Sequence, residues 1–199
     1  MAAGDPNPDL ETHERDGRRL RSADSRARIV AAMLALIEEG DISPGAEAVA
    51  ARAEVGLRTV FRHFKDMDSL YQEMIEVIAG VMRQAAGAPI QATVWRERIL
   101  ELVTRRAEVF EHIAPFKRAA DAHRLRSPVF EVAGERMSRA LREIIRRELP
   151  DAAQADPLLL EGLDLLLSFE TWSRLRREQG LGPAETRAVL EGIVRRLIG

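Results

Sequence analysis

A short run of polar side chains in the N-terminal half has the chemistry to contact a polyanion. The run contains Arg58, Thr59, Arg62, His63 and Lys65. An arginine can donate two parallel hydrogen bonds to a guanine edge, and a threonine presents both a methyl and a hydroxyl group to a base. Arginine, histidine and lysine also donate to phosphate oxygens, which positions a protein without reading sequence. The alternative interpretation is an ordinary solvated basic face.

Apolar residues at helical spacing predict the element that holds this run. Val60 and Phe64 fall on one face of a helix that begins after Gly56, so the polar residues are left outside. Val55 precedes the cap and Val60 is the fourth helical residue, which is the spacing of a hydrophobic staple. The polar run is therefore expected to be an exposed surface with an apolar anchor behind it.

Further helices are expected on both sides. One covers about 23–39 and stops at Gly40, which supplies a left-handed residue. A short one covers about 46–53, and Asp66 caps a fourth helix. Three helices with a tight turn between the last two follow the helix-turn-helix plan, whose final helix enters a major groove of DNA.

At this point the chain resembles the TetR/AcrR family of transcription regulators. The string from Val55 to Phe64 is similar to the family's recognition helix. The resemblance covers about residues 24–80. Matching anchors on the flanking helices are Ile29-Val30-Ala31-Ala32, Glu39-Gly40, Val49-Ala50, Ala53 and the stretch from Lys65 to Leu70. The resemblance implies a homodimer, usually a repressor, that leaves a double-stranded DNA operator when a small-molecule effector enters the C-terminal domain.

The resemblance also assigns DNA contacts. Thr59 and His63 match contacting positions, whereas Phe61 stands where the family usually has a tyrosine that reaches a phosphate. Glu54 replaces a turn glycine, so some backbone strain is expected there. At the start of the second helix, Gly45 stands beside Ala46 where the family usually has a hydroxyl residue, and free N–H groups there could still meet a phosphate. Met67 replaces a common lysine at the fourth helix. The arginines within 15–21 are expected to compensate for the lost phosphate contacts.

The C-terminal half is expected to add five helices, over about 91–112, 115–124, 128–149, 157–178 and 184–198. The fourth of these is apolar around most of its circumference, so a partner subunit is expected to cover it. The predicted two-fold, four-helix interface contains Leu159, Leu163, Leu166, Leu167, Val189, Ile193 and Leu197. A purely intramolecular core helix is the alternative.

An effector pocket is expected in the same half, lined by aromatic, histidine and methionine side chains. The candidates are Trp95, Phe110, His112, Phe116, His123, Phe130, Met137, Phe169 and Trp172. Aromatic residues at such spacing also occur as plain core. Glu170 lies beside this face and would suit a cationic ligand, although a solvated surface glutamate is the simpler interpretation.

The predicted fold class is all-α, with about nine helices in three parts. These are a flexible arm over 1–22, a three-helix DNA-binding domain with its linking helix over 23–86, and a ligand-sensing and dimerisation bundle over 87–199. The chain has 199 residues and no cysteine, which excludes disulfides and thiolate chemistry. No apolar run is long enough to span a bilayer, and a cytoplasmic protein is expected. The net charge of −2 hides local basic clusters.

Two other functions remain open. An enzyme is not expected, because the sequence has no glycine-rich phosphate loop and no nucleophile elbow; no cofactor is predicted. Glu108, His112 and His123 are a weak zinc signal, and ordinary surface residues fit them better. A helical module that binds protein instead of DNA would explain the apolar C-terminal helix, but it would leave the outward arginines unexplained.

Overall fold

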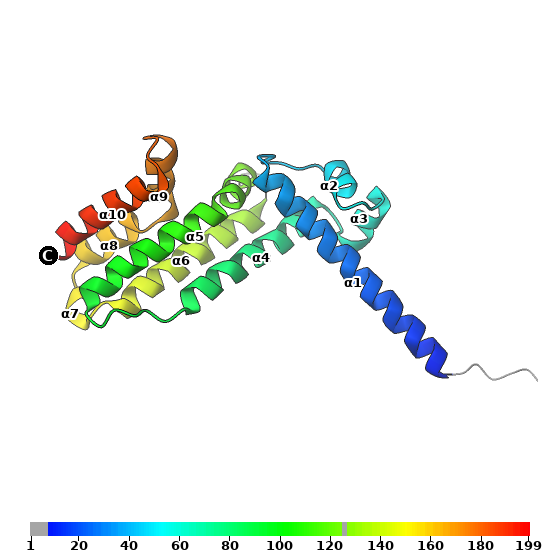
Figure 1. Cartoon of the computed structure of the whole chain (residues 1–199), viewed down its shortest axis with the longest axis horizontal. Coiled ribbons are helices and arrows are strands. Elements are labelled where there is room, and N and C mark those ends of the chain that lie inside the picture. The colour runs from blue at the N-terminus through cyan, green and yellow to red at the C-terminus, as the bar shows by residue number, and fades with distance from the viewer. Residues whose placement is uncertain (1–7, 125–126) are drawn as a thin grey trace, which may run out of the picture. The chain divides into compact units, whose positions relative to one another are not determined.

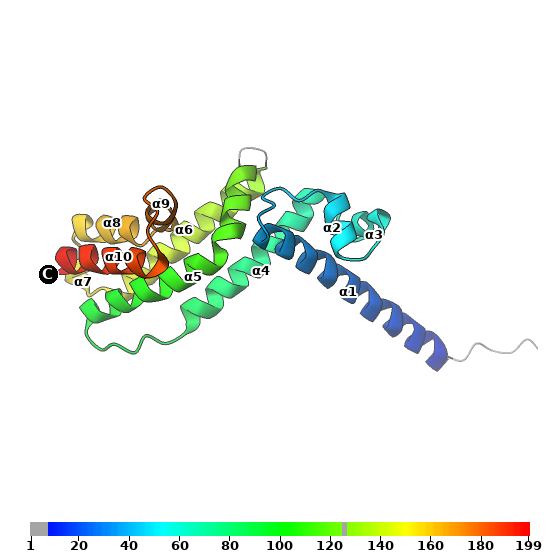
Figure 2. The same ribbon diagram turned by 45° about the horizontal axis from the view of Figure 1, so that its top comes forward.

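The structure is a computed structural model that describes residues 8–124 and 127–199, with side chains from residue 22 onward. Ten α-helices and no strand occur within these ranges (Figures 1 and 2). The all-α prediction is confirmed. The chain divides into two compact units, Met1–Met74 and Ile75–Gly199. This division falls inside a helix, whereas the sequence predicted a boundary between residues 86 and 87.

The N-terminal unit contains α1 (Pro8–Glu38), α2 (Ala46–Arg52), α3 (Leu57–His63) and the first turns of α4 (Met67–Gly87). These four helices share one apolar core, in which the fully or nearly fully buried side chains are Ile29, Met33, Ile37, Val49, Val60, Phe64, Leu70 and Met74. Met74 is the last α4 residue of this core, which is why the unit ends within α4.

The first helix is longer than predicted. The sequence assigned residues 1–22 to a flexible arm, but α1 begins at Pro8. The stretch lacks an apolar period, yet it is rich in arginine and glutamate, which lose little freedom in a helix. Residues 1–7 lie outside the described part of the chain, as do the side chains of the arginines at 15, 18, 19 and 21.

Two predicted helix ends in this unit are confirmed, the stop of α1 at Gly40 and the start of α4 after Asp66. Gly40 has φ of 106°, a left-handed conformation that terminates α1 without steric penalty. The backbone N–H of Ser69 donates to the Asp66 carboxylate at 2.9 Å, and the Ser69 hydroxyl accepts from the Asp66 N–H at 3.3 Å. This reciprocal pair caps α4 and fixes where the segment after α3 turns into the next helix.

The C-terminal unit contains the remainder of α4 and six more helices. They are α5 (Trp95–His123), α6 (Pro128–Glu148), α7 (Asp151–Gln154), α8 (Pro157–Leu166), α9 (Phe169–Arg177) and α10 (Pro183–Ile198). Helix α10 lies along both α5 and α8 (Figures 1 and 2). Phe110, Leu163 and Val194, from these three helices, are nearly inaccessible to solvent and mark the centre of the core.

Helix α5 continues through a proline that the sequence interpreted as a break. Two helices, over about 91–112 and 115–124, were predicted, but Pro115 lies inside the single helix α5. An interior proline removes one hydrogen bond and costs roughly 3 kcal/mol. Ile113, Ala114 and Phe116 beside it are all buried, and this packing offsets the loss.

The predicted helix over 157–178 is interrupted near its middle. Helix α8 ends at Leu166 and α9 starts at Phe169, with Ser168 as the N-cap between them. The Ser168 hydroxyl donates to the Leu165 carbonyl at 2.7 Å and accepts from the Thr171 N–H at 3.1 Å. A serine that satisfies groups on both sides favours such a break over a continuous helix.

Candidate functional site

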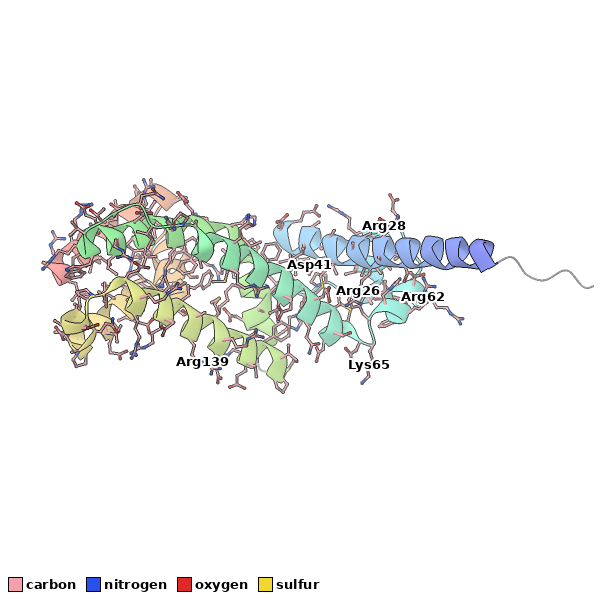
Figure 3. The ribbon with its side chains drawn as sticks, turned by 90° about the horizontal axis from the view of Figure 1, so that it is seen from below. Arg26, Arg28, Asp41, Arg62, Lys65 and Arg139 are labelled. Carbon is pink, nitrogen blue, oxygen red and sulfur yellow. The ribbon has the colours of Figure 1, made fainter. Side chains whose placement is uncertain are left out.

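The exposed face of α3 carries the polar run identified in the sequence. Arg58, Arg62 and Lys65 are exposed, and Figure 3 shows Lys65 pointing away from the helices. On the opposite face, Val60 and Phe64 are 1% and 2% exposed. The anchors hold α3 so that its cationic side chains point to solvent. This is the arrangement that contact with a polyanion requires.

Other side chains complete this face. Thr59 is part-exposed, and the ring of Phe61 is 46% exposed although phenylalanine is usually buried. Gly45, at the start of α2, is exposed, whereas the side chain of the adjacent Ala46 is buried in the unit's core. An exposed aromatic ring beside exposed arginines suits contact with a thymine methyl or with the sugar-phosphate edge.

Arg26 positions α3 from within the unit, and sequence reasoning missed this role. One of its terminal nitrogens donates to the His63 carbonyl at 2.9 Å, and the other donates to the Glu73 carboxylate at 2.6 Å. The guanidinium carbon lies 4.3 Å from the centroid of the Phe64 ring. Arg26 therefore links α1 to the end of α3 and to α4. Sequence reasoning could not find this role, because no local pattern signals a partner 37 residues away.

His63 differs electrostatically from its arginine neighbours. Burial, followed by the charges of Arg62 and Arg26, lowers the pKa of the His63 imidazole. Its Nε2 atom is buried and has no hydrogen-bond partner within the described part of the chain. These surroundings favour the uncharged imidazole, and the fixed positive charge of the surface comes from Arg58, Arg62 and Lys65.

The turn before α3 has the strain expected from the sequence. Glu54 has φ of 54°, the left-handed region that a glycine adopts more easily. Its neighbour Val55 donates from its N–H to the Ala50 carbonyl at 3.0 Å, which closes the end of α2. Gly56 then caps α3 with extended backbone. The close succession of α2 and α3 depends on this turn.

A cavity of about 630 Å³ lies within the C-terminal unit, between α4, α5, α6 and the segment that joins α4 to α5. This volume is in the range of small-molecule sites. Much of its wall is apolar, with Met82, Leu102, Val109, Met137 and Ile144 contributing.

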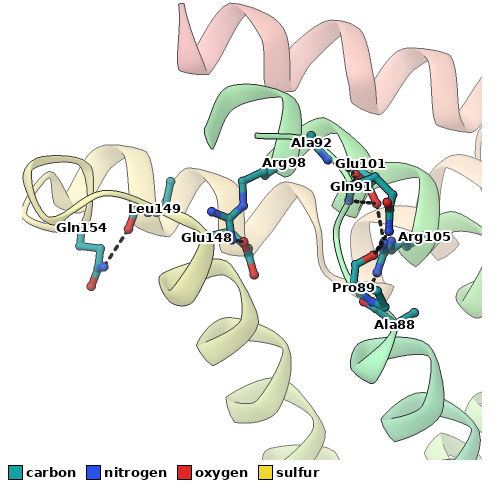
Figure 4. Close-up of polar contacts among 10 residues, drawn as sticks. All are labelled: Ala88, Pro89, Gln91, Ala92, Arg98, Glu101, Arg105, Glu148, Leu149 and Gln154. Carbon is teal, nitrogen blue, oxygen red and sulfur yellow. Dashed lines mark hydrogen bonds and ion pairs between the residues drawn. The ribbon is translucent and has the colours of Figure 1, made fainter. Parts of the chain in front are cut away.

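The joining segment, which contributes Ala88, Pro89 and Ile90 to the cavity lining, is fixed by polar contacts (Figure 4). Arg105 donates to the carbonyls of Ala88 and Pro89 and pairs with Glu101. Glu101 in turn accepts from the Gln91 N–H at 3.0 Å and from the Ala92 N–H. The hydrogen bond from Ala92, together with those from Arg105 and Gln91, lowers the pKa of the Glu101 carboxyl.

The cavity brings together only two of the nine predicted effector residues, Phe110 and Met137. Phe169 and Trp172 pack against Phe110 from the core side, with ring centroids 5.5 and 6.1 Å from it. The other five also lie outside the cavity lining. Trp95 stacks under Arg96, His112 is exposed, Phe116 is buried, and His123 stacks on Phe130. Most of the predicted aromatic set is therefore core.

Charged side chains, which the sequence prediction did not include, are prominent in the cavity wall. Six arginines and two glutamates line it: Arg83, Arg98, Arg105, Arg106, Arg136, Arg147, Glu76 and Glu148. The sequence could have revealed Arg106 as an unusual residue, because it falls on the apolar stripe of α5 between Leu102, Val103 and Phe110. A charged residue on such a stripe signals a functional or strained site.

The predicted dimer residues separate into buried and accessible sets. Leu163 and Leu167 are at most 3% exposed inside their own unit, so the structure corrects their assignment to a partner subunit. Leu159, Leu166 and Leu197 are partly buried against the same core. Val189 and Ile193 are exposed, as are Leu158 and Leu165, which the prediction had left out.

The described residues contain no group of three histidine, aspartate or glutamate side chains that could hold a metal ion. Glu108, His112 and His123 are therefore not brought together as ligands. No described helix combines the length and apolar character needed to cross a bilayer. Glu170 is exposed and forms an ion pair with Lys117 at 3.6 Å.

Comparisons with known proteins identify the fold. No protein-family model and no curated protein matches the chain. A solved structure from Streptomyces coelicolor, proposed to be a transcriptional regulator, is 21% identical, with 87% of this chain and 97% of that one covered at a TM-score of 0.55. A proposed TetR-family transcriptional regulator from Mesorhizobium loti MAFF303099 is 18% identical, with 89% and 96% covered at a TM-score of 0.50. The chain therefore has a TetR-like fold.

Proposed function

We propose that this chain is a homodimeric, non-enzymatic transcription regulator, a repressor that leaves its operator when a small molecule fills the cavity of the C-terminal unit. The exposed face of α3, with Arg58 and Arg62 outward and Val60 and Phe64 buried behind, carries the proposal. In a helix-turn-helix protein this helix enters the major groove, where arginine and threonine side chains reach base edges. The TetR-like fold supports the same assignment.

Dimerisation is proposed through an apolar face that α8 and α10 form together. Leu158 and Leu165 on α8 are 76% and 68% exposed, and Ile193 on α10 is 42% exposed. A Cβ added to Gly162 would lie 3.0 Å from a methyl carbon of Leu197, so this glycine allows the two helices to approach closely. Leucine side chains this exposed on adjacent helices favour a second copy as their cover.

Effector control is proposed to act through α4. Residues from Ile75 to Gly87 of this helix line the cavity, and its first turn follows the exposed Lys65 at the end of the α3 face. A molecule that prefers one position of α4 shifts the population between DNA-binding and released forms. Cytoplasmic localisation follows from a role on chromosomal DNA.

The test is selection of DNA from a random-sequence pool by the purified full-length protein, followed by affinity measurements at several salt concentrations. We expect one enriched two-fold-related sequence. The affinity for it should fall with salt by about 0.9 log units per log unit of salt for each phosphate contact. Without enrichment, and with a flat salt response, DNA binding would be rejected in favour of a protein-interaction module.

A matched pair of variants locates the interface. Arg58→Ala should weaken binding by about 1–3 kcal/mol and relax the preference at one base position. Arg174→Ala removes another exposed arginine, on α9 of the C-terminal unit, and should bind the selected DNA like the wild type. Equal losses for both variants would show that the effect reflects total charge and not the α3 surface.

A further inference from the structure

The wall of the cavity in the C-terminal unit has an excess of positive charge. Its charged side chains are six arginines and two glutamates. Several of these arginines already have a protein partner. Arg98 pairs with Glu148, Arg105 pairs with Glu101, and Arg136 lies 3.6 Å from Glu76.

Among the described residues of the wall, Arg106 is the buried cation that no carboxylate neutralises, whereas Arg147, which also lacks an ion pair there, is exposed to solvent. Its side chain is 6% exposed, and its two terminal nitrogens donate to the carbonyls of Leu167 at 2.7 Å and Leu141 at 2.5 Å. These acceptors are neutral. No carboxylate lies within 4 Å of Arg106 in the described ranges, and its Nε atom has no acceptor there. Asp164, an acidic residue whose charge acts on Arg106 without direct contact, is itself held by Arg142 at 2.9 Å.

Burial lowers the pKa of the Arg106 guanidinium to about 10. The side chain therefore keeps its charge at neutral pH, in surroundings that stabilise a charge poorly. An uncompensated buried cation is costly unless something binds it. A ligand anion in the cavity would supply the missing negative charge.

The rest of the wall describes the other part of the ligand. Met82, Val109, Met137 and Ile144 line the cavity with apolar atoms. An apolar wall with one buried cation matches a molecule that has a hydrocarbon or aromatic body and a single anionic head. A guanidinium binds a carboxylate or a phosphate through parallel hydrogen bonds.

We propose that the effector of this cavity is an amphipathic anion, an apolar body with one oxyacid head that neutralises Arg106. The regulatory role of this ligand rests on the proposed function, whereas its binding to the cavity does not, because binding requires no DNA. The head is expected to lie toward α5 and the body between α4 and α6.

The test is calorimetric titration of the full-length protein, without DNA, with four probes that share one alkyl chain. They are decanoate, decyl phosphate, decanol and decylamine, each used below the concentration at which it forms micelles. We expect at least one of the two anions to bind at least about tenfold more tightly than the alcohol. The amine should bind more weakly than the alcohol. Comparison of the two anions identifies the preferred head group.

Variants assign the discrimination to Arg106. Arg106→Met should bind decanoate and decanol equally, and Arg106→Lys should restore part of the preference for the anion. Arg174→Met, an exposed arginine outside the cavity, is the control and should match the wild type. Because Arg106→Met also loses two hydrogen bonds and is at risk of misfolding, Glu148→Gln provides a second test. It removes an acidic group from the wall and should tighten anion binding several-fold.

The proposal is overturned if decanol or decylamine binds as tightly as both anions, or if none of the four probes binds. It is also overturned if Glu148→Gln leaves anion affinity unchanged in a folded protein. DNA selection and probe titration are separate measurements. Failure of the first rejects the regulator, and failure of the second rejects only the ligand class.

Discussion

Arg26 on α1 donates a hydrogen bond to the main-chain carbonyl of His63, the last residue of α3, at 2.9 Å. The carbonyls at a helix end lack partners within the helix, so an arginine there satisfies one of them and also suits the negative end of the helix dipole. The same guanidinium pairs with Glu73 and stacks on Phe64. The orientation of α3 is therefore set from the first helix as well as from its own apolar anchors.

Replacing Arg26 with methionine should loosen α3 without removing a side chain from the exposed face. The variant loses one bond to a carbonyl and one to a carboxylate, and we expect a loss of ~1–2 kcal/mol in the free energy of unfolding. DNA affinity should fall as well. Chemical denaturation and DNA titration measure the two effects. Arg28→Met is the matched control, since Arg28 is exposed and forms just one loose ion pair in the described structure, with Asp24 at 3.9 Å. A variant as stable as this control would contradict the linking role of Arg26.

Phe61 offers a test in which function should improve. Its ring is 46% exposed on the α3 face, so a tyrosine at this position has room for its hydroxyl. We expect Phe61→Tyr to bind the selected DNA about three- to tenfold more tightly, because the hydroxyl can donate to a phosphate. Phe61→Ala should bind more weakly than the wild type. If tyrosine and phenylalanine give equal affinities, the ring does not approach the DNA backbone.

The lowered pKa of His63 gives a pH prediction with a definite sign. The unfolded chain holds this proton more tightly than the folded unit, so acidification favours unfolding. Stability should fall as the pH decreases from the ordinary histidine value of 6.5 toward the lower folded value. For one proton the slope is at most ~1.4 kcal/mol per pH unit.

The measurement is thermal unfolding between pH 5 and 8. His63→Asn should flatten the pH dependence, whereas His112→Asn, which changes an exposed histidine of the other unit, should not. A steeper acid loss in His63→Asn than in the wild type would have the wrong sign.

Two acidic substitutions on α8 test the proposed dimer face. Leu158→Glu combined with Leu165→Glu alters the most exposed leucines of α8, so each unit should keep its fold. Two glutamates from each subunit, four in all, would be buried between the subunits at a large cost, and sedimentation should show a monomer. Affinity for a two-half-site operator should fall by more than about tenfold. Val132→Glu, at an exposed valine of α6, should remain dimeric. A dimeric double variant would place the interface elsewhere.

The helix-turn-helix region was predictable because its signals are local. Gly40, Gly56 and Asp66 mark helix ends within a few residues of the apolar positions that they terminate, and all three act as expected. The strain at Glu54 also followed from one residue standing where a glycine fits better. Short-range rules of capping and periodicity are sufficient for features of this kind.

The C-terminal unit was harder to predict because its features depend on tertiary contacts. Pro115 has the local signature of a break, but packing on both sides keeps α5 continuous. Ser168 looks like one polar residue in an apolar helix until its bonds to Leu165 and Thr171 are seen. A pocket in this half was predicted, but most of its lining was not, because the aromatic residues expected to line it mostly fill the core.

Arg106 borders the cavity and also holds the carbonyl of Leu167, the residue that terminates α8. A ligand that draws this guanidinium into the cavity would compete with its hydrogen bond to Leu167 at the end of α8. Helix α8 also carries Leu158 and Leu165 of the proposed dimer face. Filling of the cavity and association of subunits would then share a single side chain. By thermodynamic reciprocity, a dimer and a monomer of this chain would hold the same ligand with different strengths.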